Sequence, residues 1–267
     1  TLGRMSDLDA RRDHALEAML ARERPGTPIY AFQRVESTMD IGHELASRGE
    51  PEGTLVWALR QEQSRGRLGR AWISPAGGAY CSLILRPARA TDETPQIALV
   101  AGLCVAETLR DQACVYPTIR WPNDLLLGEK KVSGILVEVR REAAIVGVGI
   151  NLAPDPSVLP PEATSLAASG TTSCSVEDVI TGFCRRMDRW YAQWTRDGFS
   201  PVREALRPWM GLFGKVVQIR AGSQEFEGTA MDVDERGRLV VRFDAGLLRA
   251  FDMGEVTLLR NKIGDSH

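Results

Sequence analysis

The stretch that decides the fold is TIRWPNDLLLGEKKVSGILVEVRREAAIVGVGINL, residues 118–152. Apolar runs alternate here with the polar segments GEK and REA, which are long enough only for tight turns. Strands joined by such short turns must run antiparallel, because a parallel pair needs a crossover of a dozen residues or more. The stretch therefore predicts an antiparallel meander with strands at 118–127, 131–140 and 143–152.

The segments upstream of the meander predict both helices and strands. Residues 7–23 carry leucine and methionine at helical spacing and predict one helix, capped by an aspartate near its start. A second helix is expected to begin at Ser37 or Thr38 and to end at Gly49. Apolar runs between turn residues predict strands at 29–35, 53–60 and 79–86, and a helix at 95–112.

The composition changes after the meander. Four prolines between 154 and 161 predict an irregular connection. Residues 175–196 predict a long helix with an apolar stripe, which is either a stacking surface or, as the spacing favours, a face packed into the core. A short helix is expected at 201–210, and alternation from Phe213 onward predicts a small all-strand module. The stripe comprises Val179, Phe183, Met187, Trp190, Tyr191 and Trp194.

Composition narrows the class of protein. The chain has 267 residues, enough for one large domain or a medium domain with a small appendage. Its 33 basic and 35 acidic residues give a net charge of −2, which argues against a protein that coats nucleic acid or an anionic membrane. The five cysteines form no CxxC pair and predict reduced, packed thiols. Without a leader or a long apolar run, we expect a soluble cytoplasmic protein.

Three segments carry candidates for chemistry. RGRLGRAW, residues 65–72, is a solvated basic loop, a nucleic-acid contact or a lid that orders over an anion. After WPND, the return strand begins with Lys131, which is either a strand-edge gatekeeper or a charge aimed into a cavity. The glycines of GVGIN, residues 147–151, indicate either close approach of a ligand or bulges and packing.

In this order, Ser37-Thr38, RGRLGRAW, WPND, KKVSGILVE and GVGIN resemble the biotin protein ligase family, from about residue 30 onward. The resemblance implies an α+β fold. A catalytic domain related to class II aminoacyl-tRNA synthetases, with an antiparallel-rich mixed sheet and flanking helices, would be followed by an SH3-like barrel. The implied domains are an N-terminal helix or extension at 1–28, the catalytic domain at 29–210 and the barrel at 211–262.

The resemblance also implies a two-step reaction. Biotin and ATP would give biotinyl-5′-AMP. Magnesium is expected on the phosphates, and no residue of this chain is assigned as its ligand. Biotin would then pass to one lysine of a biotin carboxyl carrier domain. The sequence does not distinguish among the carriers of acetyl-CoA, propionyl-CoA and pyruvate carboxylase. Neither nucleic acid nor a membrane is an expected partner, and the family allows a homodimer formed through a sheet edge.

Roles carried over from the family fall on individual residues of this chain. Arg65 and Lys131 would be catalytic cations, because two anions meet and charge builds on the phosphoryl oxygens. Asp124 would orient or deprotonate the incoming lysine. The implied biotin-binding residues are Ser37, Thr38, Met39, Gln61, Arg65, Arg67, Lys131 and Gly134, and the nucleotide-binding residues are Arg67, Arg70, Trp72, Asn123 and Asn151.

Two departures from the family pattern stand out. Met39 follows Ser37-Thr38 where an asparagine is common, and Ser64 precedes Arg65 where a glycine is common. Neither touches the two cations, so we expect an altered affinity for biotin and retained activity. Residues 64–71 are expected to be mobile without biotin and ordered with the adenylate.

Other readings of the sequence are weaker. A lipoate or octanoate ligase would share the fold and a similar lysine, but RGRLGRAW followed by WPND is the biotin form of the pattern. A nucleic-acid module is disfavoured, because acids interrupt the arginines of the last 50 or so residues. About 25 residues precede the expected catalytic domain, too few for a winged-helix DNA-binding domain, so we expect a monofunctional enzyme that is no repressor.

Overall fold

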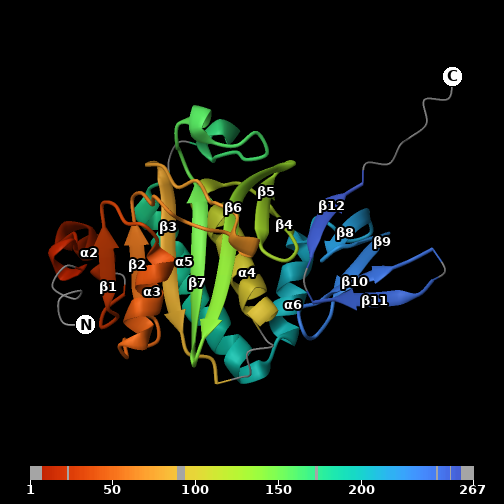
Figure 1. Ribbon diagram of the computed structural model, residues 1–267, viewed down its shortest axis with the longest axis horizontal. Coiled ribbons are helices and arrows are strands. Elements are labelled where there is room, and N and C mark those ends of the chain that lie inside the picture. The colour runs from red at the N-terminus through yellow and green to blue at the C-terminus, as the bar shows by residue number, and fades with distance from the viewer. Residues whose placement is uncertain are drawn as a thin grey trace.

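The computed structural model describes residues 8–22, 24–88, 94–171, 174–244, 246–252 and 254–259. Within them the chain forms a seven-stranded sheet with helices on both faces and a separate five-stranded sheet near the C-terminus (Figure 1). The predicted α+β class is therefore confirmed. The expected boundaries of the N-terminal extension, catalytic domain and barrel stay predictions.

The large sheet has the strand order β1-β2-β3-β7-β6-β5-β4. Neighbouring strands are antiparallel except for β1 and β2, which run parallel and are joined through a helix. The short turns of the meander thus give antiparallel neighbours, as predicted. The strands are β1 Ile29–Phe32, β2 Leu55–Ala58, β3 Gly78–Leu85, β4 Thr118–Arg120, β5 Asp124–Leu127, β6 Lys130–Arg140 and β7 Ala143–Asn151.

The prediction of one strand over 118–127 is wrong. The segment makes two antiparallel strands, β4 and β5, in which Arg120 pairs with Asp124 across a tight turn. Pro122 in that turn has no N–H to give to a neighbouring strand, so a continuous ladder through it is disfavoured. WPND therefore forms a corner at the end of the sheet, and its peptide bond between Trp121 and Pro122 is cis.

Helices cover both faces of the large sheet (Figure 1). Helix α3, Thr38–Ser47, packs on one face against β2, β3 and β7. Helices α4, Thr94–Ala113, and α5, Val176–Asp197, pack against each other and cover the opposite face. The stripe on α5 is the core face that its spacing favoured, since its side chains are buried except for the half-buried Trp190.

Two expected helices differ from the structure. The helix predicted over 7–23 breaks, and α2, His14–Ala21, begins after Asp13, whose carboxylate accepts hydrogen bonds from two backbone amides of the first turn. The helix expected at 201–210 is α6, Ser200–Leu206, followed by a 3₁₀ turn at Arg207–Trp209. Pro208 in that turn cannot donate the next helical hydrogen bond.

The C-terminal sheet has the order β11-β10-β9-β8-β12. The segment 248–259 forms two strands, β11 and β12, that lie at opposite edges of this sheet. The buried side chains of the sheet join the α4 and α5 core in one cluster. The strands are β8 Val216–Ala221, β9 Gln224–Val233, β10 Leu239–Arg242, β11 Leu248–Phe251 and β12 Glu255–Leu258.

Hydrogen bonds of buried side chains also join the two sheets. The indole N–H of Trp121 donates to the carbonyl of Gly237 at 2.9 Å. Gln96 on α4 donates to the carbonyl of Glu235 at 3.0 Å and accepts from the indole N–H of Trp194 at 2.6 Å. Gln96 therefore ties α4, α5 and the second sheet together at one point.

Replacing Gln96 with leucine is expected to lower the free energy of unfolding by about 2 kcal/mol, because two buried hydrogen bonds are lost together. Urea denaturation measures this. The matched control is Gln112→Leu, at an exposed position of the same helix, where a change within about 0.5 kcal/mol is expected. Equal losses in the two variants would show that the buried amide does not hold the sheets together.

Candidate active site

A cavity of about 490 Å³ opens on the α3 side of the large sheet, beneath the loop that contains η1, Arg67–Gly69. Its floor is formed by β6 and β7, and its far wall by β12 of the second sheet. Every residue that the sequence assigned to the site lines it. These are Ser37, Thr38, Met39, Gln61, Arg65, Arg67, Arg70, Trp72, Asn123, Asp124, Lys131, Gly134 and Asn151.

The beginning of α3 forms one end of the cavity. Ser37 occupies the N-cap position, but its hydroxyl makes no capping hydrogen bond. Instead the carboxamide oxygen of Gln61 accepts from the backbone N–H of Thr38 at 2.8 Å and from its hydroxyl at 3.0 Å. The buried Ser37 hydroxyl has no hydrogen-bond partner among the described residues. A polar atom so placed is available to a ligand.

The floor of the cavity is hollow because glycines lie on it. A methyl group added at Gly149 would lie 2.6 Å from the indole Nε1 of Trp72, and one at Gly147 would lie 2.5 Å from the sulfur of Met39. Both glycines therefore make room for side chains from other elements. Of the two alternatives for GVGIN, packing against Trp72 and Met39 accounts for Gly149 and Gly147. The indole N–H of Trp72 has no hydrogen-bond partner among the described residues.

Lys131 reaches the cavity through an irregularity in the β5–β6 pairing. Leu125 pairs with Ser133 and Leu126 pairs with Lys131, so Val132 is an extra residue on β6. Such a bulge changes which side chains share a face. As a result the Lys131 side chain lies over Gly134, where an added methyl group would come within 3.0 Å of its Cε. Lys131 is thus aimed into a cavity and is not an outward-facing gatekeeper.

The ammonium of Lys131 lies 2.6 Å from a carboxylate oxygen of Asp124. Arg120 lies 2.7 Å from the other oxygen of the same carboxylate. The ammonium also lies over the Trp72 ring, 4.9 Å from its centre, where the ring's negative face attracts a cation. Lys131 and Asp124 therefore form an ion pair within the site.

The three loop arginines have different surroundings. The guanidinium of Arg65 contacts two carboxylates, those of Glu138 and Asp40. The exposed Arg70 lies 2.5 Å from an oxygen of Glu255 on β12. Arg67 instead donates to the side-chain oxygen of Asn123 at 3.0 Å and to the carbonyl of Gly254 at 3.3 Å.

Arg67 is therefore the loop arginine with the least compensated charge. Its contacts within the described residues include no carboxylate, and burial lowers the pKa of its guanidinium. A desolvated cation of this kind gains most from an incoming anion. The guanidinium of Arg65 already contacts two carboxylates, and its catalytic role stays a prediction.

Asn151 ends β7 at the other end of the cavity. Its amide nitrogen donates to the carbonyl of Thr164 at 3.0 Å, and its buried amide oxygen has no hydrogen-bond partner among the described residues. Thr164 belongs to the segment after the four prolines, which also bonds the backbone of Lys131 from both sides. Asn151 and Lys131 are thus linked through this irregular connection.

Sequence reasoning missed two parts of the cavity wall. One is the proline-rich segment itself, and the other is the start of β12, more than a hundred residues after the floor strands. Only the change of composition directly after GVGIN could have marked the first. The missed residues are Leu159, Pro160, Glu162, Ala163, Gly254, Glu255, Val256 and Thr257.

Comparison with known proteins agrees with this arrangement. Residues 31–155 match the Biotin/lipoate A/B protein ligase family, and residues 212–259 match the Biotin protein ligase C terminal domain. A bifunctional ligase/repressor of Bacillus subtilis is 31% identical over 259 residues, 93% of this chain and 78% of that protein. A biotin–[acetyl-CoA-carboxylase] ligase of Paracoccus denitrificans is 36% identical over 206 residues, 72% of this chain and 85% of that protein.

Solved structures give the same result. The biotin protein ligase of Aquifex aeolicus, solved in complex with biotin and ATP, has a TM-score of 0.78 and 29% identity and covers 88% of this chain and 99% of its own. The Leishmania major ligase with biotinyl-5-AMP has a TM-score of 0.58 and 25% identity. The match covers 84% of this chain and 98% of the Leishmania chain. The expected fold, a class II synthetase-like domain with an SH3-like barrel, is confirmed. This chain belongs to the biotin protein ligase family.

Proposed function

We propose that the cavity carries out both steps of ATP-dependent biotin transfer: biotin and ATP give biotinyl-5′-AMP and pyrophosphate, and biotin then passes to a carrier lysine. The observation that carries this proposal is the convergence of all the predicted site residues on one cavity. The Aquifex aeolicus relative was solved with biotin and ATP, the two substrates of the first step.

In the first step an oxygen of the biotin carboxylate attacks the α-phosphorus of ATP, and the bond from that phosphorus to the pyrophosphate oxygen breaks. Both reactants are anionic, so positive charge fixed in advance lowers the barrier. Lys131 and Arg67 supply it from the floor and from the loop. Arg65 was the other predicted cation, and its contacts with Glu138 and Asp40 give it a second role that is argued below.

Binding roles follow from the unpartnered polar atoms. The Ser37 hydroxyl, with Thr38 and Gln61 beside it, fits the polar head of biotin. The unpartnered oxygen of Asn151 suits the amino edge of a base, and Arg70 together with the indole N–H of Trp72 suits phosphate oxygens. Ligand groups at Ser37, Trp72 and Asn151 would pair buried polar atoms that have no hydrogen-bond partner among the described residues.

In the second step a neutral carrier amine attacks the mixed anhydride and AMP leaves. Asp124 is the proposed acceptor of the proton from the incoming ammonium. It lies at the start of β5, paired with Lys131 and Arg120. Because two cations hold the carboxylate in place, its oxygens keep a fixed position for the incoming lysine.

Magnesium is proposed as the companion of ATP. The described residues contain no group of three or more His, Cys, Asp or Glu side chains suited to a metal. Its ligands would therefore come mainly from phosphate oxygens and water, the usual arrangement for magnesium with a nucleotide. The ion would neutralise phosphate charge, and the protein's own cations would act on the α-phosphate and the carboxylate.

The alternative of a lipoate or octanoate ligase is not favoured. One matched family covers both activities, but the C-terminal match is to biotin protein ligases. The Paracoccus denitrificans relative and the two solved structures reported above are also biotin ligases by name. The partner is a biotin carrier of a carboxylase, with acetyl-CoA carboxylase as the carboxylase named in that relative. Pairing of two copies stays a prediction.

A cytoplasmic location is proposed from the thiols. All five cysteines lie in the described residues, and none forms a disulfide. Cys81, Cys104 and Cys184 are buried as expected, whereas Cys114 is exposed and Cys174 is half-buried, so the expectation of packed thiols fails at these two. Among the described residues no helix combines the length and apolar character needed to cross a bilayer.

Purified protein is expected to exchange labelled pyrophosphate into ATP with biotin and not with octanoate or without an acid. Reversal of the adenylation step makes this exchange possible, so the assay reports on the first step alone. Exchange with octanoate alone would move the chain to the lipoate side of the family. No exchange with either acid would contradict the proposed reaction.

Two substitutions are expected to separate the steps. Lys131→Met is expected to lower the rate of biotin-dependent exchange about 100-fold or more, because a cation at the reacting centre is lost. Asp124→Asn is expected to keep exchange within about tenfold and to slow transfer to a carrier domain about 100-fold. Lys130→Met is the control, since Lys130 is the exposed neighbour of Lys131 and does not line the cavity. Equal loss of both steps in Asp124→Asn would contradict the assignment.

Met39→Asn is expected to lower the dissociation constant of biotin about 2- to 10-fold, since one added hydrogen bond contributes about 0.5–1.5 kcal/mol. Titration calorimetry measures this. Met19→Asn, at an exposed methionine of α2, is the control and should leave binding unchanged. An unchanged dissociation constant in Met39→Asn would show that this departure from the family pattern does not affect biotin.

A further inference from the structure

A charged cluster lies just outside the cavity on the α3 side of the large sheet. It consists of Arg65 from the loop, Asp40 and His43 from α3, and Glu138 and Arg140 from β6. Of these residues only Arg65 lines the cavity. Nothing in the roles proposed above uses Glu138 or His43.

Glu138 holds the guanidinium of Arg65 through two hydrogen bonds. Nε of Arg65 donates to one carboxylate oxygen at 2.9 Å, and Nη2 donates to the other at 3.0 Å. The remaining nitrogen, Nη1, lies 2.8 Å from an oxygen of Asp40. This paired arrangement fixes the plane and the direction of the guanidinium, which one point charge could not do.

His43 in turn fixes Glu138. Its Nε2 lies 2.7 Å from the same carboxylate oxygen that accepts from Nη2 of Arg65, and its side chain is 8% exposed. Burial lowers the pKa of His43, which favours the neutral imidazole that donates one hydrogen bond. Arg140, at 3.7 Å, is the other cation near this carboxylate.

The backbone leaves these residues little freedom. Glu138 follows Gly134 and Leu136 on the α3 face of β6, which is paired along its length with β7. Helix α3 lies close to that face, since a methyl group added at Gly42 would come within 3.0 Å of an Ile145 side-chain carbon. His43 is the next residue of the helix. The anchor for Arg65 is therefore built on regular elements.

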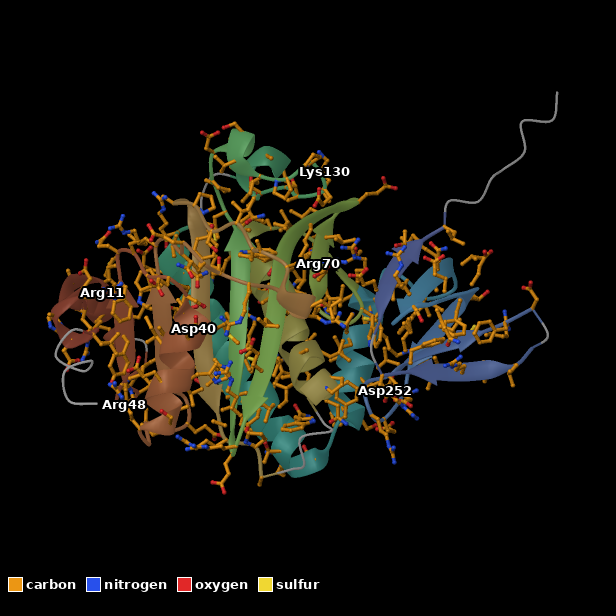
Figure 2. All side chains as sticks on the ribbon, in the orientation of Figure 1. Arg11, Asp40, Arg48, Arg70, Lys130 and Asp252 are labelled. Carbon is orange, nitrogen blue, oxygen red and sulfur yellow. The ribbon has the colours of Figure 1, made fainter. Side chains whose placement is uncertain are left out.

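The loop is held at its other end as well. Ser64 donates from its hydroxyl to the carbonyl of Trp72 at 2.7 Å and closes the base of the loop. Arg70 contacts Glu255 of the second sheet. Figure 2 shows Asp40 on the α3 side of the large sheet and Arg70 nearer the second sheet. Release of the Arg65 end would free the segment that carries Arg67 over the cavity.

We propose that Glu138 is a positioning residue for biotin adenylation: it fixes Arg65, and through Arg65 it holds the loop over the cavity. This departs from the sequence-based expectation that residues 64–71 are mobile without biotin. His43 orients the carboxylate for this task. The proposal deepens the proposed function and rests on it. Because an anchored loop has less conformational freedom to lose on binding, the anchor favours biotin binding more than the chemical step.

The test is Glu138→Gln in the full chain, with Glu142→Gln as the matched control at an exposed position of the same hairpin. Without substrates, trypsin should cut after Arg65, Arg67 and Arg70 about tenfold faster in Glu138→Gln than in the wild type. The KM for biotin in pyrophosphate exchange should rise about tenfold, while kcat at saturating biotin stays within about twofold. Glu142→Gln should match the wild type in every measurement.

A second pair of variants tests the same proposal if Glu138→Gln does not fold. His43→Gln keeps a side-chain N–H near the position of Nε2, and His43→Leu removes it. The proposal is supported if His43→Gln keeps the wild-type cleavage rate and KM. In His43→Leu, faster cleavage and a raised KM are expected. Unchanged cleavage or an unchanged KM in Glu138→Gln overturns it, even where the melting temperature falls. Cleavage needs no substrate, so loss of the anchor is distinguishable from absence of biotin activity in the wild type.

Discussion

The site depends on three positions of the large sheet that have no side chain. Gly134, Gly147 and Gly149 lie on the α3 face of β6 and β7, where any Cβ would collide with Trp72, Met39 or Lys131. A sheet buried on both faces normally fills such positions with branched side chains. Here the missing side chains leave a hollow in an otherwise packed face. The loop, α3 and Lys131 meet over that hollow, and their polar groups can therefore surround a ligand.

Charge within the hollow is almost entirely paired by contacts within the protein. Lys131, Arg65 and Arg70 each contact a carboxylate, and only Arg67 relies on neutral acceptors in the described part of the chain. The hydrogen bonds from Arg65 lower the pKa of Glu138 to about 2, against the opposing effect of burial. Since that value lies below the ordinary one near 4.5, the pair stabilises the fold at neutral pH. That contribution is lost only as the pH falls from about 4.5 toward 2.

Local patterns were enough for most of the strands, and the residues that the family resemblance implied for the site do line one cavity. Short polar turns fixed the antiparallel neighbours, and the helical stripe on α5 gave its core face. Two of the errors have a common cause. Pro122 and Pro208 each ended an element that apolar spacing alone extended. Ser37 has the residue type of a helix cap, but Gln61, 24 positions later, makes the capping bonds instead. Sequence spacing holds no sign of such a distant partner.

The wall formed by the second sheet shows why the rest of the site lay beyond sequence reasoning. Gly254 and Glu255 contact Arg67 and Arg70 across nearly two hundred residues of chain, and neither has a type or spacing that suggests a site. Their position follows from how the two sheets dock, through Trp121 on Gly237 and Gln96 on Glu235. The same WPND corner that supplies Asn123 and Asp124 also supplies Trp121 to that docking contact. One turn therefore serves both the docking of the second sheet and the reacting centre of the site.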